Sequence, residues 1–246
     1  MISALRHGCI ATKQKLRVLM VESSHLEEAV DIDPRLNKLA WEKLKSADGV
    51  LVPGGFGVRG IEGKVQAIKY ARENNIPFLG ICLGMQAAVI EYTRTILNRP
   101  LANSKEFSPN IDESNAAIIF MPEGDRNIMG GTMRLGARNT LIKENTIAER
   151  LYKRNIISER HRHRYEVNPQ LVNELESNGL LFSGKDLETS NRMEIIEIPK
   201  QIHPYFVAVQ FHPEFQSRPL RPSPVFEGTH MLEIYFYNFV INYKDY

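Results

Sequence analysis

The first hundred residues switch repeatedly between short apolar runs and segments in which apolar residues recur at helical spacing. Three apolar runs predict buried strands, at Leu16–Glu22, Gly49–Val52 and Pro77–Ile81. Three segments with apolar residues three or four positions apart predict amphipathic helices, over Ile2–Lys13, Pro34–Ala47 and Ile61–Asn74. Strands that alternate with helices in this way are typical of a parallel sheet covered on both faces.

From Pro100 onward the pattern changes to short β-prone pieces, which predict hairpins or an antiparallel extension of the sheet. They are Ala116–Met121, Gly131–Leu135, Arg160–Val167, Leu180–Ser183, Met193–Ile198 and Phe206–Phe211. A helix with proline in its first turn is predicted over Asn168–Asn178, and a terminal helix rich in aromatic residues over Val225–Tyr243. The prediction is an α/β protein with a mostly parallel central sheet flanked by helices and an antiparallel β extension. Because no repeat or linker divides the chain, residues 1–246 are predicted to form a single domain.

Composition narrows the classes of protein to consider. With 246 residues, 43% hydrophobic and 24% charged, the chain is ordinary for a soluble globular domain. A formal charge of +2 does not favour nucleic acid or an anionic membrane as a partner. The two cysteines, Cys9 and Cys82, form neither a disulfide framework nor a metal-binding spacing, so no metal is predicted. Apolar runs far shorter than the roughly 20 residues of a membrane span, and the lack of a signal-type segment, favour the cytoplasm.

Candidate chemistry begins where the third strand meets the next helix. Gly80, Cys82 and Gly84 have the spacing of a nucleophile elbow, a sharp turn that holds one side chain above the carboxyl end of a sheet. At a helix N-terminus, the free N–H groups and the macrodipole favour the thiolate form of Cys82. The alternative is that Cys82 is a small buried hydrophobic residue, which is the usual fate of a free cysteine.

A base and a residue to orient it follow the last predicted strand, in His212-Pro213-Glu214. Residues two apart in an extended segment point to the same side, so Glu214 can accept a hydrogen bond from one nitrogen of His212 while the other faces Cys82. Proline fixes its own backbone and keeps His212 out of the helical region. A structural histidine is the alternative for His212.

The loop Pro53-Gly54-Gly55-Phe56-Gly57 follows the second strand. Its Gly55 N–H and the Leu83 N–H are predicted to form an oxyanion hole beside Cys82. A phosphate-binding loop is the alternative, but its pattern of glycines, lysine and serine or threonine is absent.

Three motifs in this order, PGGFG, GICLGMQ and HPE, resemble the triad-type (class I) glutamine amidotransferases. PGGFGVRG, GGTMRLG, RHRHRYEVN and HPEFQSRP together are similar to the glutaminase domain of the CTP synthases, over nearly the whole chain. The resemblance implies a flavodoxin-like fold and hydrolysis of L-glutamine through a thioester at Cys82. It also implies that the ammonia passes to a synthase domain, which aminates UTP to CTP in an ATP-dependent step of pyrimidine nucleotide synthesis.

The resemblance further implies which residues bind glutamine. Glu106 would hold the α-ammonium group and Arg164 the α-carboxylate, with polar contacts from Gln86 and Tyr165 and a pocket shaped by Phe56. The full set carried over is Gly54, Gly55, Phe56, Leu83, Gly84, Met85, Gln86, Glu106, Arg164 and Tyr165. Surface charges are the alternative for Glu106 and Arg164. A nucleic-acid patch is the alternative for Arg160–Arg164, and the near-neutral net charge disfavours it.

Cofactors and partners also come from the resemblance. It implies no cofactor in this domain, ATP and Mg in the synthase domain, and GTP as an allosteric activator. The glycine-rich segments Phe56–Gly63 and Gly130–Gly136 are expected to be lids, with Arg59 and Arg134 coupled to GTP. The implied partners are L-glutamine and the synthase domain, in a full-length homotetramer and with the isolated domain compatible with a monomer. Neither the preceding synthase domain nor the expected first strand lies in these 246 residues.

Two other functions remain open from the residues themselves. A Cys-His hydrolase of γ-glutamyl compounds would use the same chemistry on other substrates. A catalytically silent domain that serves regulation or assembly is the second, and the presence of Cys82, His212 and Glu214 together argues against it.

Overall fold

The computed structural model describes the backbone of residues 1–28, 32–121, 133–231 and 238–243, and side chains up to residue 228. Its helices are α1 (Ile2–Thr12), α2 (Pro34–Lys45), α3 (Ile61–Glu73), α4 (Leu83–Thr95), α5 (Ile147–Tyr152), α6 (Pro169–Ser177) and α7 (Pro224–Met231). Its strands are β1 (Arg17–Glu22), β2 (Gly49–Val52), β3 (Phe78–Ile81), β4 (Asn103–Ser104), β5 (Ala116–Phe120), β6 (Arg134–Ile142), β7 (Ile156–His163), β8 (Tyr165–Val167), β9 (Leu181–Asp186), β10 (Met193–Ile198), β11 (Phe206–Val209) and β12 (Asn238–Tyr243).

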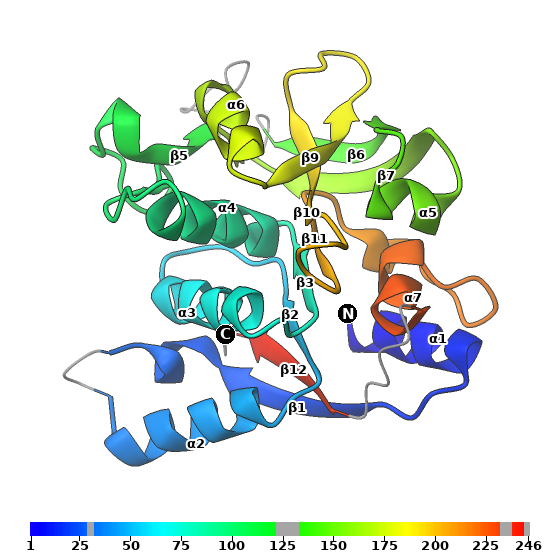
Figure 1. Cartoon of the computed structure of the whole chain (residues 1–246), viewed down its shortest axis with the longest axis horizontal. Coiled ribbons are helices and arrows are strands. Elements are labelled where there is room, and N and C mark those ends of the chain that lie inside the picture. The colour runs from blue at the N-terminus through cyan, green and yellow to red at the C-terminus, as the bar shows by residue number, and fades with distance from the viewer. Residues whose placement is uncertain (29–31, 122–132, 232–237, 244–246) are drawn as a thin grey trace.

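One large sheet joins a parallel half to an antiparallel half (Figure 1). Among the described residues its strand order is β1-β12-β2-β3-β11-β10-β9-β6-β7. The pairs from β1 to β11 are parallel, and those from β11 to β7 are antiparallel. A second, small sheet has the order β4-β5-β8. The predicted fold class, a mostly parallel sheet with an antiparallel extension, is therefore confirmed.

Helices cover both faces of the parallel half, as Figure 1 shows. One apolar cluster joins the sheet to α2, α3, α4 and α6, and a second joins it to α1, α5 and α7. Side chains alternate between the two faces of a strand, so each strand contributes to both clusters. In β2, Val50 and Val52 belong to the first cluster and Leu51 to the second. None of the helices in the described ranges has the length and hydropathy of a membrane span.

Local sequence accounts for where several elements begin. Asp33 caps α2 by accepting the Arg35 N–H at 2.9 Å, and Asn168 caps α6 by accepting the Gln170 N–H at 3.0 Å. Proline occupies the next position in both helices, where its missing N–H costs nothing. The three strands and three helices predicted in the first hundred residues are confirmed to within two residues at each end.

The prediction of one helix over Val225–Tyr243 is wrong in its second part. Only α7 is helical, and Asn238–Tyr243 forms β12, a parallel strand that pairs with β1 on one side and β2 on the other. The run Phe239-Val240-Ile241 is aromatic and β-branched, which suits a central strand. Its partners lie far away in sequence, so local periodicity could not distinguish the two structures. Residues 232–237 lie outside the described part of the chain.

In the second half, some strands differ in length from the prediction: β5 and β11 end earlier than predicted, β10 has the predicted bounds, and β6 is longer. β6 continues to Ile142, beyond the predicted Gly131–Leu135, whose first residues 131–132 lie outside the described ranges. The predicted Arg160–Val167 divides into β7 and β8, with Arg164 between them. Along β7 burial alternates, so His161 and His163 face the interior while Arg160 and Arg162 are exposed.

Candidate active site

Cys82 stands at the sharp turn between β3 and α4. Its φ of 52° and ψ of −103° are strained for a residue with a side chain. The turn is fixed on both sides, because the Cys82 N–H donates to the Val209 carbonyl at 2.7 Å and the Cys82 carbonyl accepts from Met85 at 3.0 Å. A Cβ on Gly84 would lie 2.1 Å from the Val52 carbonyl oxygen, so only glycine allows α4 to pack this closely on β2.

Besides the imidazole of His212, two polar groups contact the Cys82 sulfur. Nε2 of Gln210 lies 3.6 Å from Sγ, and the carbonyl oxygen of Arg162 lies 3.9 Å from it. The Cys82 side chain is nearly buried, with 4% of its surface exposed. The sulfur thus sits in a polar setting at a helix N-terminus, which the alternative of a buried apolar cysteine did not anticipate.

His212 and Glu214 lie beyond the end of β11, where they form the hydrogen bond that their spacing predicted. Nδ1 of His212 is 2.9 Å from Oε1 of Glu214, while the buried Nε2 has no hydrogen-bond partner among the described residues. Burial acts to lower the pKa of His212, but interactions with Cys82 and Glu214 outweigh it and raise the pKa to about 10. The interactions with Cys82 and Glu214 therefore favour the protonated imidazole.

Gly54 shows that the imidazole and the thiol converge. A Cβ built on Gly54 would lie 2.9 Å from Cε1 of His212 and 3.3 Å from Cβ of Cys82. Both side chains therefore border the same small space beside the loop after β2. The backbone of His212 is also tied to the antiparallel half, since its N–H donates to the Arg160 carbonyl at 2.8 Å.

A cavity of about 390 Å³ opens in front of the sulfur. Most of the predicted oxyanion-hole and glutamine-binding residues line it, namely Gly55, Phe56, Leu83, Gln86, Glu106, Arg164 and Tyr165. Leu83 is the first residue of α4, so its N–H is one that the helix leaves without an acceptor. Gly55 lies next to it, because a Cβ on Gly55 would be 3.6 Å from Cδ2 of Leu83.

Opposite charges face each other in this cavity. Burial raises the pKa of Glu106, and this rise is opposed by a hydrogen bond from the Gly57 backbone and by the positive charge of Arg164. Nε of Arg164 is buried and has no hydrogen-bond partner among the described residues. A ligand that carries both an ammonium and a carboxylate group would match this pair.

Three other predicted residues do not line the cavity. Gly54 lies behind it against His212, Gly84 packs on β2, and Met85 is fully buried in the core. Their contact with substrate stays a prediction.

A family model for class-I glutamine amidotransferases matches residues 2–232. The chain belongs to this family. The sequence motifs had indicated three parts of the amidotransferase at the carboxyl ends of the strands. These parts are the elbow, the His212–Glu214 pair and the glycine loop.

Within this family, the amidotransferase is similar to CTP synthases. It is 54% identical over 228 residues to CTP synthase 2 of Xenopus laevis and 49% identical over 232 residues to CTP synthase 1 of Saccharomyces cerevisiae. Each match covers 92% of this chain but only 39% and 40% of the relative, so the chain spans about two fifths of their length.

A solved structure, the glutaminase domain of Trypanosoma brucei CTPS with bound acivicin, superimposes with a TM-score of 0.83 at 39% identity. The match covers 94% of this chain and 85% of that one. The amidotransferase is therefore an enzyme domain of the CTP synthase glutaminase type.

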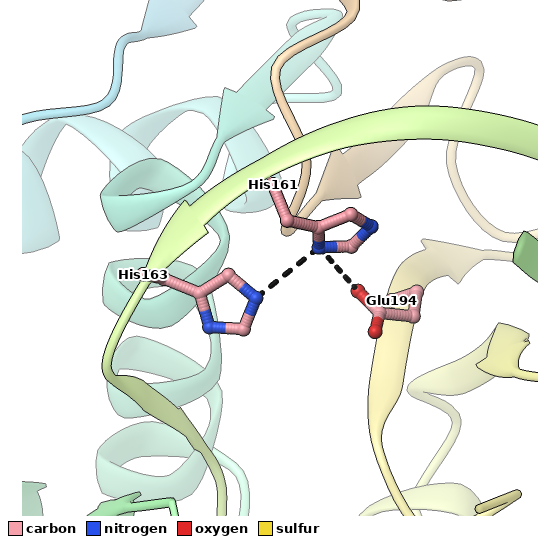
Figure 2. A group of neighbouring side chains, drawn as sticks. All are labelled: His161, His163 and Glu194. Carbon is pink, nitrogen blue, oxygen red and sulfur yellow. Dashed lines mark hydrogen bonds and ion pairs between the residues drawn. The ribbon is translucent and has the colours of Figure 1, made fainter. Parts of the chain in front are cut away.

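His163 lines the cavity of the amidotransferase and belongs to a buried polar group on β7 and β10, whose residues His161, His163 and Glu194 are shown in Figure 2. Nδ1 of His161 is 3.2 Å from Nε2 of His163 and 3.4 Å from Oε2 of Glu194, whose Oε1 is 3.2 Å from the Arg134 guanidinium. Nδ1 of His163 donates to the Tyr165 carbonyl at 3.1 Å. Burial lowers the pKa of His161 to about 2 and of His163 to about 3, and raises that of Glu194 to about 8.

Of the described residues, His161, His163 and Glu194 are those whose ligand atoms could hold a metal ion, lying within 4.8 Å of one another. Among the described residues, Nε2 of His161 and both carboxylate oxygens of Glu194 are buried without a hydrogen-bond partner. A carbonyl only accepts, so His163 carries its proton on Nδ1, and its Nε2 must accept from His161 Nδ1. The positive charge of Arg134, 3.2 Å from Glu194, only partly opposes the rise in the Glu194 pKa that burial causes. We describe the group as a buried polar wall of the cavity.

The two arginines of the predicted lids are in different surroundings. Arg59 is exposed and pairs with Glu22 at 2.8 Å. Arg134 is buried at the start of β6, where it pairs with Asp186 and Glu194. Residues 130–132 of the second lid lie outside the described ranges, so its role stays a prediction.

Sequence reasoning missed several residues at the site. Met133, Arg162 and His163 line the cavity, and Gln210 contacts the sulfur. Gln210 had a usable signal, because it lies two positions before His212 and so shares its side of an extended segment. Arg162 contacts Cys82 through its backbone, and no side-chain pattern could have indicated that.

Proposed function

We propose that this chain hydrolyses L-glutamine to glutamate and ammonia, with Cys82 as nucleophile, His212 as acid and base, and Glu214 as the residue that orients His212. The observation that carries the proposal is the convergence of the Cys82 thiol and the Glu214-bound imidazole on one space at Gly54, beside a cavity with Glu106 and Arg164. The family match and the similarity to CTP synthase glutaminase domains support it.

Acylation begins when the Cys82 thiolate attacks the side-chain amide carbon of glutamine. The carbonyl electron pair moves to oxygen, and the N–H groups of Gly55 and Leu83 stabilise this oxyanion. As the tetrahedral intermediate collapses, the C–N bond breaks and protonated His212 gives its proton to the leaving nitrogen. Ammonia departs, and a γ-glutamyl thioester remains on Cys82.

Deacylation uses the same groups in reverse. Neutral His212 removes a proton from water, whose oxygen attacks the thioester carbon. Collapse of the second intermediate breaks the C–S bond, releases glutamate and restores the thiolate beside protonated His212. The charge of Glu214 favours the imidazolium, and together with the interaction with Cys82 it raises the pKa of His212 to about 10 in the unacylated site.

Glu106 and Arg164 select the substrate by its α-groups. The carboxylate of Glu106 pairs with the α-ammonium and the guanidinium of Arg164 with the α-carboxylate, which fixes the side-chain amide toward Cys82. Phe56 closes the apolar side of the cavity, and Gln86 and Tyr165 contribute polar contacts.

The ammonia serves a synthase domain that aminates UTP to CTP with ATP and Mg, within a full-length, homotetrameric, cytoplasmic enzyme. The chain spans only about two fifths of the length of its CTP synthase relatives, which supports a further domain of this kind.

GTP activates the glutaminase through Arg59 and Arg134. Unchanged GTP stimulation in full-length Arg59→Ala and Arg134→Ala enzymes would refute that role, with thermal stability measured as a control because Arg134 is buried in ion pairs.

The test compares glutamate release from L-glutamine by the chain with release by Cys82→Ala and His212→Ala, and uses acivicin, which the Trypanosoma brucei relative binds, to label the thiol. We expect each variant to lose roughly 10³-fold or more in kcat and acivicin to modify Cys82 alone. Equal hydrolysis of γ-glutamyl peptides extended beyond the α-carboxylate would favour the broader hydrolase. Failure of acivicin to label Cys82 would favour the silent domain.

A further inference from the structure

We propose that Gln210 is a further catalytic residue, whose side-chain amide donates a hydrogen bond to the Cys82 sulfur and stabilises the thiolate. The proposal rests on the proposed function, because it assigns a role toward the same nucleophile. Nε2 of Gln210 lies 3.6 Å from Sγ. Hydrogen bonding to the charged form of an acid favours that form.

The burial of Gln210 strengthens its hydrogen bond to the Cys82 sulfur. Gln210 is fully buried, and its side chain therefore has no water to satisfy it. Its backbone N–H donates to the Glu194 carbonyl at 2.8 Å, which fixes the residue between β10 and the end of β11. Neither end of this side chain can turn away without leaving a buried polar atom unpaired.

A chain of hydrogen bonds decides which end of the amide faces the sulfur. The Tyr165 carbonyl only accepts, so the Gln86 atom 2.9 Å from it must be the amide nitrogen. That nitrogen also lies 3.1 Å from the Gln210 side chain, which must therefore present its oxygen. The nitrogen of Gln210 is then the atom that faces Cys82.

The opposite contact strengthens the assignment. The Arg162 carbonyl, 3.9 Å from Sγ, can only accept a proton from a neutral S–H. Gln210 is thus the neighbouring neutral group that favours the thiolate, whereas Arg162 through its backbone favours the thiol.

Other charged groups near the sulfur stay the same when Gln210 is changed. His212, with Glu214 behind it, interacts with Cys82 from the segment after β11. Arg162, His163, Arg164 and Glu106 line the same cavity from β7, the β7–β8 connection and the segment after β4. Differences between variants at position 210 therefore report the amide itself.

The experiment measures alkylation of Cys82 by iodoacetamide as a function of pH in the whole chain, with peptide mass spectrometry to separate Cys82 from Cys9. Burial raises the pKa of Cys9 to about 11, so its reaction is slow. The variants are Gln210→Met, which keeps length but loses the donor, and Gln210→Glu, which places a carboxylate there. Gln170→Glu makes the same chemical change at an exposed position remote from the site.

We expect the midpoint of the alkylation profile to rise by roughly 1 to 2 pH units in Gln210→Met and further in Gln210→Glu. Gln170→Glu should match the wild type. Glutamine hydrolysis by Gln210→Met should fall roughly 10- to 100-fold at neutral pH and recover part of this loss at alkaline pH. A loss of structure alone would not recover in this way.

An unchanged midpoint in folded Gln210→Met would overturn the proposal while leaving the glutaminase intact. If alkylation of Cys82 left glutamine hydrolysis unaffected, the proposed function itself would fail. Should both variants at position 210 fail to fold, the side-chain amide resonance of Gln210 in the wild type decides the matter. It must shift when Cys82 is alkylated, and a constant resonance would count against the hydrogen bond.

Discussion

At the scale of single residues, the site depends on close approaches that leave no room for an added atom. Gly54 is the clearest case, since any Cβ there would meet both His212 and Cys82. The glycine was singled out from the sequence as part of the loop after β2. Its contact with the imidazole was not foreseeable, because the two residues are brought together by the pairing of both β2 and β11 with β3.

Gly54→Ala should lower kcat for glutamine by roughly 10²-fold, because the new Cβ would lie 2.9 Å from the His212 ring and displace it. Gly55→Ala should cost less, since its Cβ would make an ordinary 3.6 Å contact with Leu83. Steady-state kinetics with thermal melts of both variants check this. Similar losses in the two variants would contradict the packing argument.

Glu214→Gln should shift the alkaline limb of the kcat profile downward. Interactions with Cys82 and with Glu214 together raise the pKa of His212 to about 10 against the effect of burial, so removing the Glu214 charge lowers that pKa while the interaction with Cys82 remains. His212 must be protonated to expel ammonia, and activity is therefore lost at a lower pH than in the wild type. Profiles of kcat between mildly acidic and alkaline pH measure this, and coincident alkaline limbs would argue against the His212–Glu214 assignment.

At the scale of elements, the carboxyl ends of neighbouring parallel strands supply the site from segments distant in sequence. β2 leads to the glycine loop, β3 to Cys82 and β11 to His212. The convergence of these three segments could be predicted from the sequence, because strand–helix alternation implies parallel strands whose carboxyl ends share one edge. The antiparallel extension was also predicted, but the division of Arg160–Val167 between β7 in the large sheet and β8 in the small sheet was not, because the sequence is one continuous β-prone run.

The terminal strand is the element that sequence reasoning placed wrongly, and its position between β1 and β2 gives it a clear test. Val240→Pro removes an N–H and should destabilise the fold by roughly 3 kcal/mol or more, because β12 pairs on both edges. Val240→Ile keeps the N–H and β-branching. Chemical denaturation should separate the two, and equal unfolding free energies would contradict a central β12.

At the scale of the whole molecule, the two halves of the sheet meet at the active site. The parallel half provides Cys82, whereas the antiparallel half provides the wall with His163 and the buried ion pair of Arg134 and Glu194. The His212 backbone bonds to Arg160 across this junction. The nucleophile, the base and the substrate pocket therefore depend on both halves of the sheet.

The most direct test of this account is to look for the acyl-enzyme. The chain is mixed with L-glutamine, quenched in acid during turnover and digested for peptide mass spectrometry. The account predicts a γ-glutamyl thioester on the Cys82 peptide, lost on treatment with hydroxylamine and absent from Cys82→Ala. Continued glutamine hydrolysis by Cys82→Ala, or turnover with the adduct on another residue, would contradict it.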